Sequence, residues 1–312
     1  MSLFVGFDTS NYTTSVAVFD SVSRKMVSEK KLLPVNHGEK GLMQSKALLE
    51  HIRQLPSVSE AAFSPFNEEK ITAVGVSDKP RNIENSYMPV FLAGVASAEC
   101  VANSHKAPIY KTSHQIGHIL AALYSCNKLD LVKEKFIAFH VSGGTTEALL
   151  VTPDENNIIN CEIVAQSLDL KAGQAIDRVG VMLDLDFPAG AKLDLLSKNG
   201  VSPIKPKPVL IGVDCSISGV ENKCKQLFEK GESKENIARF VIEFVCETIA
   251  QMTEKLKEKY GDIPFVYAGG VMSNSLIKER LSKLGGLFCE PKFSSDNAAG
   301  IAIYSYLKHN EV

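Results

Sequence analysis

The sequence predicts a duplicated α/β fold, because it contains two similar β-hairpins that each carry a turn rich in hydroxyl side chains. The first hairpin is expected from the apolar runs Leu3–Asp8 and Ser15–Asp20, which flank the polar turn at Thr9–Thr14. The second is expected within Phe136–Val151, around the turn Ser142–Thr146. Internal similarity of this kind fixes the architecture of a chain, so we expect two related halves.

The glycines of the second turn, Gly143 and Gly144, permit positive φ and let another group approach the backbone closely. Hydroxyls and released N–H groups then point into one concavity, which suits phosphate oxygens. The alternative is an ordinary hairpin with a Gly-Gly turn. Two facing hairpins of this type are typical of the actin, Hsp70 and sugar-kinase (ASKHA) architecture, which predicts two lobes around a nucleotide cleft. Ser10 and Asn11 are the matching nucleotide-binding candidates in the first turn.

The length of 312 residues suits two domains, and the 45% of apolar residues predict a sizeable buried core rather than disorder. We place an N-terminal lobe at residues 1–127 and a C-terminal lobe at residues 128–312. The boundary is soft because no low-complexity linker separates the halves, and the last helix is a candidate to pack back on the first lobe. The net charge of −2 gives no general attraction for nucleic acid.

The seven cysteines are scattered and form no Cys-x-x-Cys pair, which disfavours zinc ribbons and redox motifs. Free thiols in a reducing cytosol fit this pattern best. The N-terminus begins as a strand without a basic lead or a long apolar core, so we expect no signal peptide. No apolar run approaches the length of a membrane span. These features predict a cytoplasmic protein without a membrane partner.

Apolar periodicity predicts the remaining elements. A long helix over Lys234–Tyr260 carries an apolar stripe, and a small-residue helix is expected over Val90–Asn103. A helix over 41–54 is expected to end at Pro56. Further strands are expected over 25–35, 71–76, 109–110, 161–167, 209–213, 265–268 and 287–289, and further helices over 112–125, 171–183, 191–197, 219–230 and 275–284.

His114 and His118 are separated by one turn of a helix that Thr112 or Ser113 is expected to cap. Two imidazoles on one helix face can occupy two neighbouring sites on one metal ion. The alternative is a pair of half-buried histidines near a helix start, because His-x-x-x-His is short and lacks the glutamate of the zinc-protease motif.

Acids and glycines mark further corners of the second half. Asp177, Gly190 and Asp194 frame a helix–turn–helix corner, where the alternative is two surface acids and a C-cap glycine. A strand then runs into Gly269-Gly270 and a helix, a turn that suits nucleotides because glycine admits the ligand and the helix dipole favours negative groups. Asp296 stands at the start of the last helix, where a plain N-cap or first-turn acid is the alternative to a functional role.

Taken in order, these pieces resemble one family, the tRNA threonylcarbamoyl transferases called TsaD, Gcp or Kae proteins and formerly labelled O-sialoglycoprotein endopeptidases. The resemblance covers nearly the whole chain, and seven short motifs in the same order make it specific, although this chain looks like a diverged member. The motifs are Gly6–Ser10 (like G-x-E-T-S), His114–His118 (H-x-x-x-H), Val141–Gly144 (V-S-G-G), Ala172–Asp177 (A-G-E-A-F-D), Asp214–Gly219 (D-F-S-F-S-G), Gly269–Asn274 (G-G-V-x-x-N) and Ser295–Asn297 (T-D-N).

The resemblance implies one transition metal ion, iron or zinc, held by the catalytic residues His114, His118 and Asp296. His140 is a further candidate ligand, since some members have a tyrosine there. The implied reaction is the metal-dependent transfer of a threonylcarbamoyl group from threonylcarbamoyl-AMP to N6 of the adenosine beside the tRNA anticodon, with partner proteins of the transfer complex. The implied contacts to the adenine nucleotide or threonylcarbamoyl-AMP are His140, Val141, Ser142, Gly143, Gly144, Asp177, Gly190, Asp194 and Asn274.

The chain departs from the family pattern in loops around the expected acyl-adenylate, at residues 11–13, 77–87, 145–147 and 188–191. Two alternatives therefore accompany the transferase hypothesis. One is a small-molecule kinase or carbamoyltransferase of the same fold; a kinase would use Mg²⁺, ATP and a general base, commonly an aspartate. The other is a non-catalytic paralogue that acts as a partner subunit. The histidine pair together with Asp296 disfavours both alternatives, because neither needs these residues.

Overall fold

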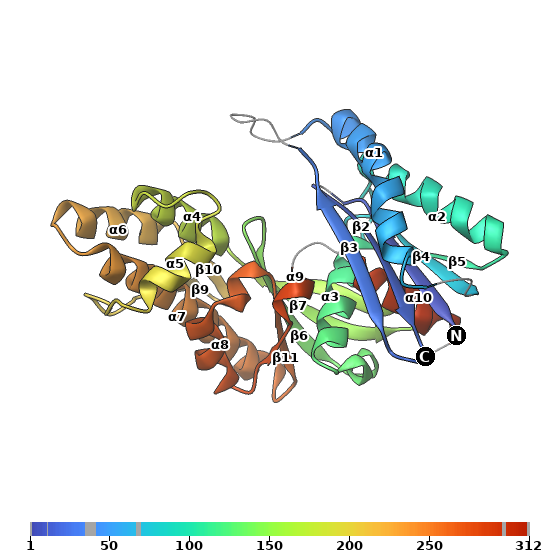
Figure 1. Cartoon of the computed structure of the whole chain (residues 1–312). Helices are drawn as coiled ribbons and strands as arrows, with labels where there is room; N and C mark the ends of the chain where they lie inside the picture. Colours follow the sequence, from blue (N-terminus) through green and yellow to red (C-terminus); the bar gives the residue numbers. More distant parts are fainter. Residues whose placement is uncertain (1, 11, 35–41, 67–69, 295–297, 311–312) are drawn as a thin grey trace. The chain divides into compact units, whose positions relative to one another are not determined.

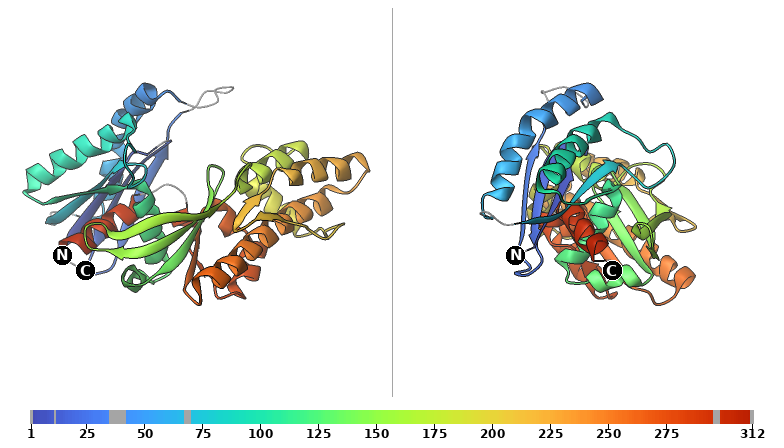
Figure 2. Two further views of the ribbon diagram at one scale, coloured as in Figure 1. Left: turned by 180° about the vertical axis from the view of Figure 1, so that it is seen from behind. Right: turned by 90° about the vertical axis from the view of Figure 1, so that its right-hand side faces the viewer.

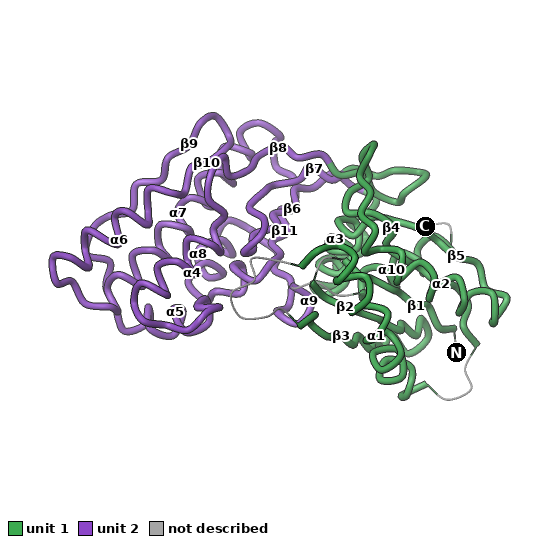
Figure 3. The backbone as a smooth tube through the Cα atoms, turned by 90° about the horizontal axis from the view of Figure 1, so that it is seen from above, with its two compact units in different colours: residues 1–133, 152–161, 295–312 green, residues 134–151, 162–294 purple. Residues whose placement is uncertain are grey.

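The computed structural model describes residues 2–10, 12–34, 42–66, 70–294 and 298–310. The chain forms two compact units, which Figure 3 colours separately. The first comprises residues 1–133, 152–161 and 295–312, and the second comprises residues 134–151 and 162–294. The last helix therefore belongs to the first unit. The division into domains at residue 127 stays a prediction.

Two five-stranded sheets repeat one strand order, which confirms the predicted duplicated α/β fold (Figure 1). The orders are β3-β2-β1-β4-β5 and β8-β7-β6-β11-β12. In each sheet the leading hairpin is antiparallel, and the next two strands are added in parallel. The strands are β1 (Leu3–Asp8), β2 (Thr13–Asp20), β3 (Met26–Leu32), β4 (Ile71–Lys79), β5 (Ile109–Ser113), β6 (Phe136–Val141), β7 (Thr146–Asp154), β8 (Ile158–Gln166), β11 (Phe265–Ala268) and β12 (Leu287–Phe288).

The strands β1 and β2 of the first unit's sheet are buried on both faces, whereas the edge strand β3 is partly exposed. Side chains alternate along a strand, and Leu3, Val5 and Phe7 of β1 enter one core with α1 (Gln44–Phe63) and α2 (Leu92–His105). The residues between them face α10 (Ala299–His309), which also packs on α3 (His114–Ser125) (Figures 1 and 2). Burial on both faces explains why β1 is almost continuously apolar rather than alternating. In β2 the apolar run is Val16–Phe19, and the polar Thr13, Thr14 and Ser15 before it are buried as well.

Helix α1 continues through Pro56, where the sequence predicted its end. Leu55, Val58 and Ala62 extend the buried stripe of the helix beyond the proline and pack in the core of the first unit. Proline inside a helix costs about 3 kcal/mol. Burial of these apolar side chains offsets that cost, so tertiary packing overrides the local signal.

The second unit is built around α7 (Lys234–Tyr260), whose predicted apolar stripe is buried. Ile137, Phe139 and Val141 of β6 share one core with this stripe. The apolar stripe of α7 is therefore part of the hydrophobic core of the second unit. Around α7 lie α4 (Ala172–Met182), α5 (Gly190–Ser197), α6 (Gly219–Glu229) and α8 (Ser275–Ser282).

Short elements complete the described chain. No helix within the described ranges is long and apolar enough to cross a membrane.

All seven cysteines are free thiols. Burial raises the pKa of Cys215 to about 11 and that of Cys246 to about 12, so both remain protonated and unreactive at neutral pH. The short elements are η1 (Pro89–Phe91), η2 (Leu129–Lys133), β9 (Val209–Ile211), β10 (Asp214–Ser216), η3 (Gly270–Ser273) and α9 (Pro291–Ser294).

Helix α10 approaches its neighbours so closely that glycine is required at the contacts. A Cβ on Gly6 would overlap the backbone of Ala298 and Ala302, and a Cβ on Gly300 would overlap the carbonyl oxygen of Gly117 in α3. These are backbone atoms, which cannot move aside as a flexible side chain can. The contact thus fixes α10 and α3 against the sheet, and α3 carries the histidine pair.

We expect Gly300→Ala to lower the free energy of unfolding by about 3 kcal/mol or more, because overpacking against fixed backbone strains the contact between α10 and α3. Gly219→Ala is the matched control, since a Cβ there meets nothing within 4 Å. Urea unfolding of both variants measures the difference. Equal stability of the two variants would contradict the packing described for α10.

Candidate functional site

The structure places the predicted site residues in two groups. His114 and His118 lie in the first unit, and most of the predicted nucleotide contacts line a cavity in the second unit. His140 is half-buried near the end of β6 in the second unit. Asn11 and Asp296 lie outside the described residues.

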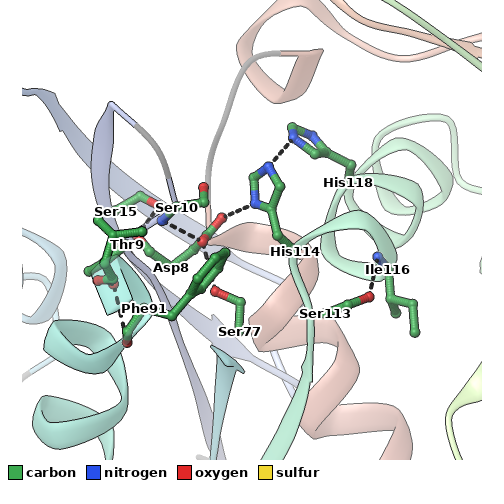
Figure 4. Close-up of polar contacts among 11 residues, drawn as sticks. Asp8, Thr9, Ser10, Ser15, Ser77, Phe91, Ser113, His114, Ile116 and His118 are labelled. Carbon is green, nitrogen blue, oxygen red and sulfur yellow. Dashed lines mark hydrogen bonds and ion pairs between the residues drawn. The ribbon is translucent and has the colours of Figure 1, made fainter. Parts of the chain in front are cut away.

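The histidine pair begins helix α3. Ser113 caps this helix, because its Oγ accepts from Ile116 N at 3.3 Å, as predicted for one of the two hydroxyls. The helical spacing brings His114 Nε2 within 2.9 Å of His118 Nε2 (Figure 4). The two ring nitrogens thus converge on one point.

Asp8, the last residue of β1, holds the first ring of the pair. Its Oδ2 lies 2.7 Å from His114 Nδ1, and its Oδ1 accepts from Ser77 Oγ at 2.7 Å and from Ser10 N at 3.0 Å (Figure 4). An ionised carboxylate only accepts hydrogen bonds. His114 therefore carries a proton on Nδ1, and in the neutral ring its Nε2 is the lone-pair nitrogen that faces His118.

The Nε2 atoms of His114 and His118 suit a transition metal ion. Two nitrogen ligands of one tetrahedral ion lie about 3.3 Å apart, close to the 2.9 Å between the two Nε2 atoms. A carboxylate behind a metal-binding histidine is a common arrangement, because it orients the ring. Among the described residues, no group of three His, Cys, Asp or Glu side chains could hold a metal, and the predicted third ligand, Asp296, lies outside them.

Ser10 adds an unused polar group close to this pair. Its side chain is 2% exposed, and its Oγ finds no hydrogen-bond partner in the part of the chain that the structure describes. Thr9 beside it is fully used, because its Oγ1 donates to Val90 O at 3.1 Å and accepts from Gly94 N at 3.1 Å. Between Thr9 and Ser10, the Ser10 hydroxyl is therefore the one that is available for a further hydrogen bond.

The second unit holds a cavity of about 410 Å³. Ile176, Pro188, Ile242 and Val271 form apolar walls of this cavity, which suits a flat ring. Val141 is fully buried in the core, and Gly144 is exposed to solvent. The predicted residues that line the cavity are Ser142, Gly143, Asp177, Gly190, Asp194 and Asn274.

The turn between β6 and β7 is shaped by its serine rather than by its glycines. Ser142 N donates to Thr145 O at 2.7 Å, and Ser142 Oγ accepts from Gly144 N at 3.3 Å and from Thr145 N at 3.1 Å. Neither Gly143 nor Gly144, both within the described part, has positive φ, so the turn does not use the positive φ that glycine permits. The Ser142 hydroxyl closes the turn by accepting from both amides.

Two other glycines let the backbone close around this turn. A Cβ on Gly173 would lie 2.6 Å from Gly143 N, and a Cβ on Gly269 would overlap the carbonyl of Val141. Gly269 also has φ of +99°, a conformation that side chains disfavour. The first turn of α4 and the turn after β11 therefore pack directly against the backbone at the end of β6 and in the turn that follows it.

Three polar side chains link the helices around the cavity. Asp177 Oδ1 accepts from Ala189 N at 2.8 Å, so Asp177 fixes the turn before α5. Asn274 caps α8 by accepting from Leu276 N at 3.0 Å, and its Nδ2 donates to Asp194 Oδ1 at 2.7 Å. Asp194 and Asn274 thus join α5 to α8 while they line the cavity.

Asp169 is a site-shaping residue that the sequence did not single out. It precedes α4, and its carboxylate accepts from Leu170 N at 2.6 Å, Ile217 N at 2.7 Å and Ser218 Oγ at 2.6 Å, and also from Ser216 Oγ. Burial acts to raise the pKa of Asp169, but the hydrogen bonds from Ser216 and Ser218 outweigh it and hold this pKa far below the usual range. Asp169 thereby ties the start of α6 to the start of α4.

Asp8 and Ser77 were missed in the same way. Asp8 lies within the motif Gly6–Ser10, but its sequence context is the end of an apolar strand. Ser77 follows the predicted strand 71–76 and was assigned to a loop, whereas the structure includes it in β4. The available signal for Asp8 was an acid placed directly after five nearly apolar residues. Its partner on α3 is 106 positions away, so spacing along the chain did not indicate the contact.

The sequence model of one family, described as TsaD: tRNA N6-adenosine threonylcarbamoyltransferase, matches residues 27–303. The chain belongs to this family. A protein named tRNA N6-adenosine threonylcarbamoyltransferase from Riemerella anatipestifer is 30% identical over an alignment of 329 residues, which covers 99% of this chain and 93% of the relative. The predicted family and the predicted enzyme class are confirmed.

Solved structures of lower identity share the fold of this TsaD-family chain. HypF from T. kodakarensis matches with a TM-score of 0.62 and 15% identity, over 98% of this chain and 48% of that one. Component A of (R)-2-hydroxyglutaryl-CoA dehydratase from Acidaminococcus fermentans matches with a TM-score of 0.57 and 16% identity, over 99% and 100%. These matches agree with the duplicated ASKHA architecture.

We expect Asp169 to make the TsaD-family chain acid-sensitive. Because the pKa of its carboxyl is lowered in the folded state, its contribution is fully present above the unfolded value of about 3.9 and is lost as the pH falls below it. Asp169 is exposed, so solvent screening keeps the contribution to about 1 kcal/mol.

Urea unfolding of the parent and of Asp169→Asn between neutral pH and pH 3 measures the contribution of the Asp169 carboxylate to the free energy of unfolding. We expect the variant to be less stable at neutral pH, and the difference from the parent to narrow as the pH falls toward 3, because the unfolded carboxyl becomes protonated while the folded one remains ionised. The exposed Asp262→Asn is the control. A parallel pH dependence of parent and Asp169→Asn would show that the hydrogen-bonded carboxylate contributes nothing.

Proposed function

We propose that the chain transfers a threonylcarbamoyl group from threonylcarbamoyl-AMP to N6 of the adenosine beside the tRNA anticodon, in the cytoplasm. The observation that carries the proposal is the cavity of the second unit. Most of the residues that family resemblance assigns to the nucleotide line this one cavity, in a chain that belongs to the transferase family. Scattered surface residues would not converge in this way.

The chemistry of the cavity suits an adenylate. The apolar walls around Ile176 and Ile242 offer a face for the adenine ring. Asp177 uses Oδ1 to hold Ala189 N, which leaves Oδ2 as an acceptor for a ribose hydroxyl. The Ser142 hydroxyl, with its lone pairs engaged in the turn, retains a proton to donate to a phosphate or carbonyl oxygen.

We further propose that His114, His118 and Asp296 hold one iron or zinc ion. When bound, the ion would supply Lewis-acid polarisation of the carbamoyl carbonyl. The chain's own residues prepare this site: the Ser113 cap starts α3 at His114, and Asp8 holds the ring of His114 so that its Nε2 faces His118. His140, half-buried near the end of β6, is proposed as an additional ligand.

We propose that tRNA binding depends on partner proteins. Contacts to phosphates dominate the affinity of proteins for nucleic acid, and a net charge of −2 does not supply them in bulk. The apolar stripe of α7 is occupied by its own core. Exposed apolar side chains remain on α1, at Leu49 and Ile52, and at the start of α2, at Leu92; these helices are the better candidates for a partner surface.

We expect protein purified without chelators to carry a transition metal, and the double variant His114→Ala, His118→Ala to lose it. Removing both imidazoles removes two of the proposed ligands. Mass-spectrometric metal analysis of the intact protein measures the content. His105→Ala is the matched control, because His105 is an exposed histidine at the end of α2. Equal metal content in the parent and the double variant would refute the ligand assignment.

We expect calorimetry to show adenine nucleotide binding at millimolar or lower concentration, and Asp194→Ala to weaken AMP by about tenfold, or about 1.4 kcal/mol. The substitution removes a carboxylate from the cavity and releases Asn274. Asp186→Ala, which removes an exposed acid near the same corner, is expected to bind AMP like the parent. The cavity would lose its assignment if the parent bound no adenine nucleotide, or if Asp194→Ala kept the parent's affinity.

The transfer reaction itself separates the hypotheses. With labelled threonylcarbamoyl-AMP, tRNA and the partner proteins of the family's complex, we expect label on adenosine of the tRNA. We expect His118→Ala to lose it and His105→Ala to retain it. Absence of label under every partner combination, with phosphate transferred from ATP to a small hydroxyl compound, would favour a kinase of the same fold.

A further inference from the structure

We propose that Asp8 is a positioning residue for the metal site of the first unit. Asp8 fixes the ring of His114 so that the Nε2 atom of this ring faces the ion. The inference rests on the metal-binding part of the proposed function. It assigns the buried carboxylate at the end of β1 a role distinct from that of a metal ligand and from that of a nucleotide contact.

The geometry shows a carboxylate that bridges three elements. Asp8 is 1% exposed at the end of β1. Its Oδ1 accepts from Ser77 Oγ on β4, and its Oδ2 lies 2.7 Å from Nδ1 of His114 at the start of α3 (Figure 4). Ser10 N, in the turn after β1, adds a further bond to Oδ1 at 3.0 Å. The position of the carboxylate is therefore determined by the sheet, independently of the helix that carries the histidines.

This arrangement has a direct consequence for the ring. Asp8 can only accept at Nδ1 of His114, so the proton stays on Nδ1 and the lone pair stays on Nε2, the atom 2.9 Å from His118 Nε2. Without the carboxylate, the acceptor at Nδ1 is lost and the ring can carry its proton on Nε2, where it blocks coordination. Outer partners of this kind typically contribute 10–100-fold to metal affinity.

Direct coordination by Asp8 fits the structure less well. Both carboxylate oxygens already accept hydrogen bonds, and the side chain is almost fully buried. The same engagement makes Asp8 a poor carrier for the hydrated Mg²⁺ that a kinase of this fold would need, because Mg²⁺ keeps several of its waters. The carboxylate acts through His114.

Asp20 provides a matched control within the same sheet. It ends β2, is also 1% exposed, and accepts from Val22 N at 3.0 Å and from Ser23 N at 3.2 Å. Asp20→Asn therefore removes an equally buried and hydrogen-bonded carboxylate charge from the same unit without touching the histidines. A loss of metal affinity that follows from general destabilisation would appear in both variants.

The experiment titrates the full-length parent, Asp8→Asn, Asp8→Glu and Asp20→Asn with Zn²⁺ and with Co²⁺, in competition with a chelating dye. Circular dichroism verifies that each variant is folded. We expect Asp8→Asn to bind both ions about 10–100-fold more weakly than the parent, Asp8→Glu to fall between the two, and Asp20→Asn to match the parent. The visible absorption of bound Co²⁺ is expected to change in Asp8→Asn alone.

Metal affinity of Asp8→Asn within twofold of the parent, or an equal loss in Asp20→Asn, overturns the inference. A second readout is independent of metal: ¹⁵N chemical shifts of the His114 ring are expected to show a protonated Nδ1 in the parent and a mixture of tautomers in Asp8→Asn. A parent that binds no metal refutes the metal part of the proposed function. If the parent binds no metal and the His114 tautomer is the same in Asp8→Asn, then Asp8 does not orient the ring either. If the tautomer does change, Asp8 orients His114 but has no role in metal binding.

Discussion

The backbone of Val141–Gly143 lies directly against two glycines, and the cavity of the second unit depends on this close approach. Gly173 admits the first turn of α4 to within contact of Gly143, and Gly269 admits the turn after β11 to the carbonyl of Val141. Any side chain at either glycine would push an element outward. Ser142, Gly143 and Gly173, which meet at this contact, line the cavity, and so does Gly270, which follows Gly269. The cavity is therefore bordered at this point by backbone and small side chains.

The first unit repeats the strand order of the second, but the residues at the end of β1 differ in chemistry from those at the end of β6. There the close approach lies beneath α10, where Gly6 and Gly300 bring the helix onto the sheet and onto α3. The end of β1 carries Asp8, a buried carboxylate that holds His114. The end of β1 thus orients a pair of imidazoles, and residues that follow the corresponding end of β6 line a cavity. Duplication of the fold supplied two equivalent positions, and the side chains placed there distinguish their chemistry.

Much of this was predictable from sequence, because the relevant signals are local. The hairpins, the stripe of α7 and the capped start of α3 follow from alternation, helical periodicity and a hydroxyl before the helix. The extension of α1 through Pro56 was not predictable, since packing against a distant sheet decides it. Asp8 and Asp169 escaped for a similar reason: their partners lie on elements remote in the chain. The sequence analysis expected the close backbone approach at Gly143 and Gly144. The structure instead requires glycine at Gly173 and Gly269, where tertiary contacts leave no room for a Cβ.

The AMP affinity of Gly173→Ala tests most directly the central claim, that the backbone contact of Gly173 with Ser142 and Gly143 shapes the cavity. The added methyl would lie 2.6 Å from Gly143 N, so the account predicts a loss of at least about tenfold, or about 1.4 kcal/mol, in a chain that remains folded by circular dichroism. Gly219→Ala, at a helix start with open space around it, should bind AMP like the parent. Parent affinity in Gly173→Ala would contradict the account.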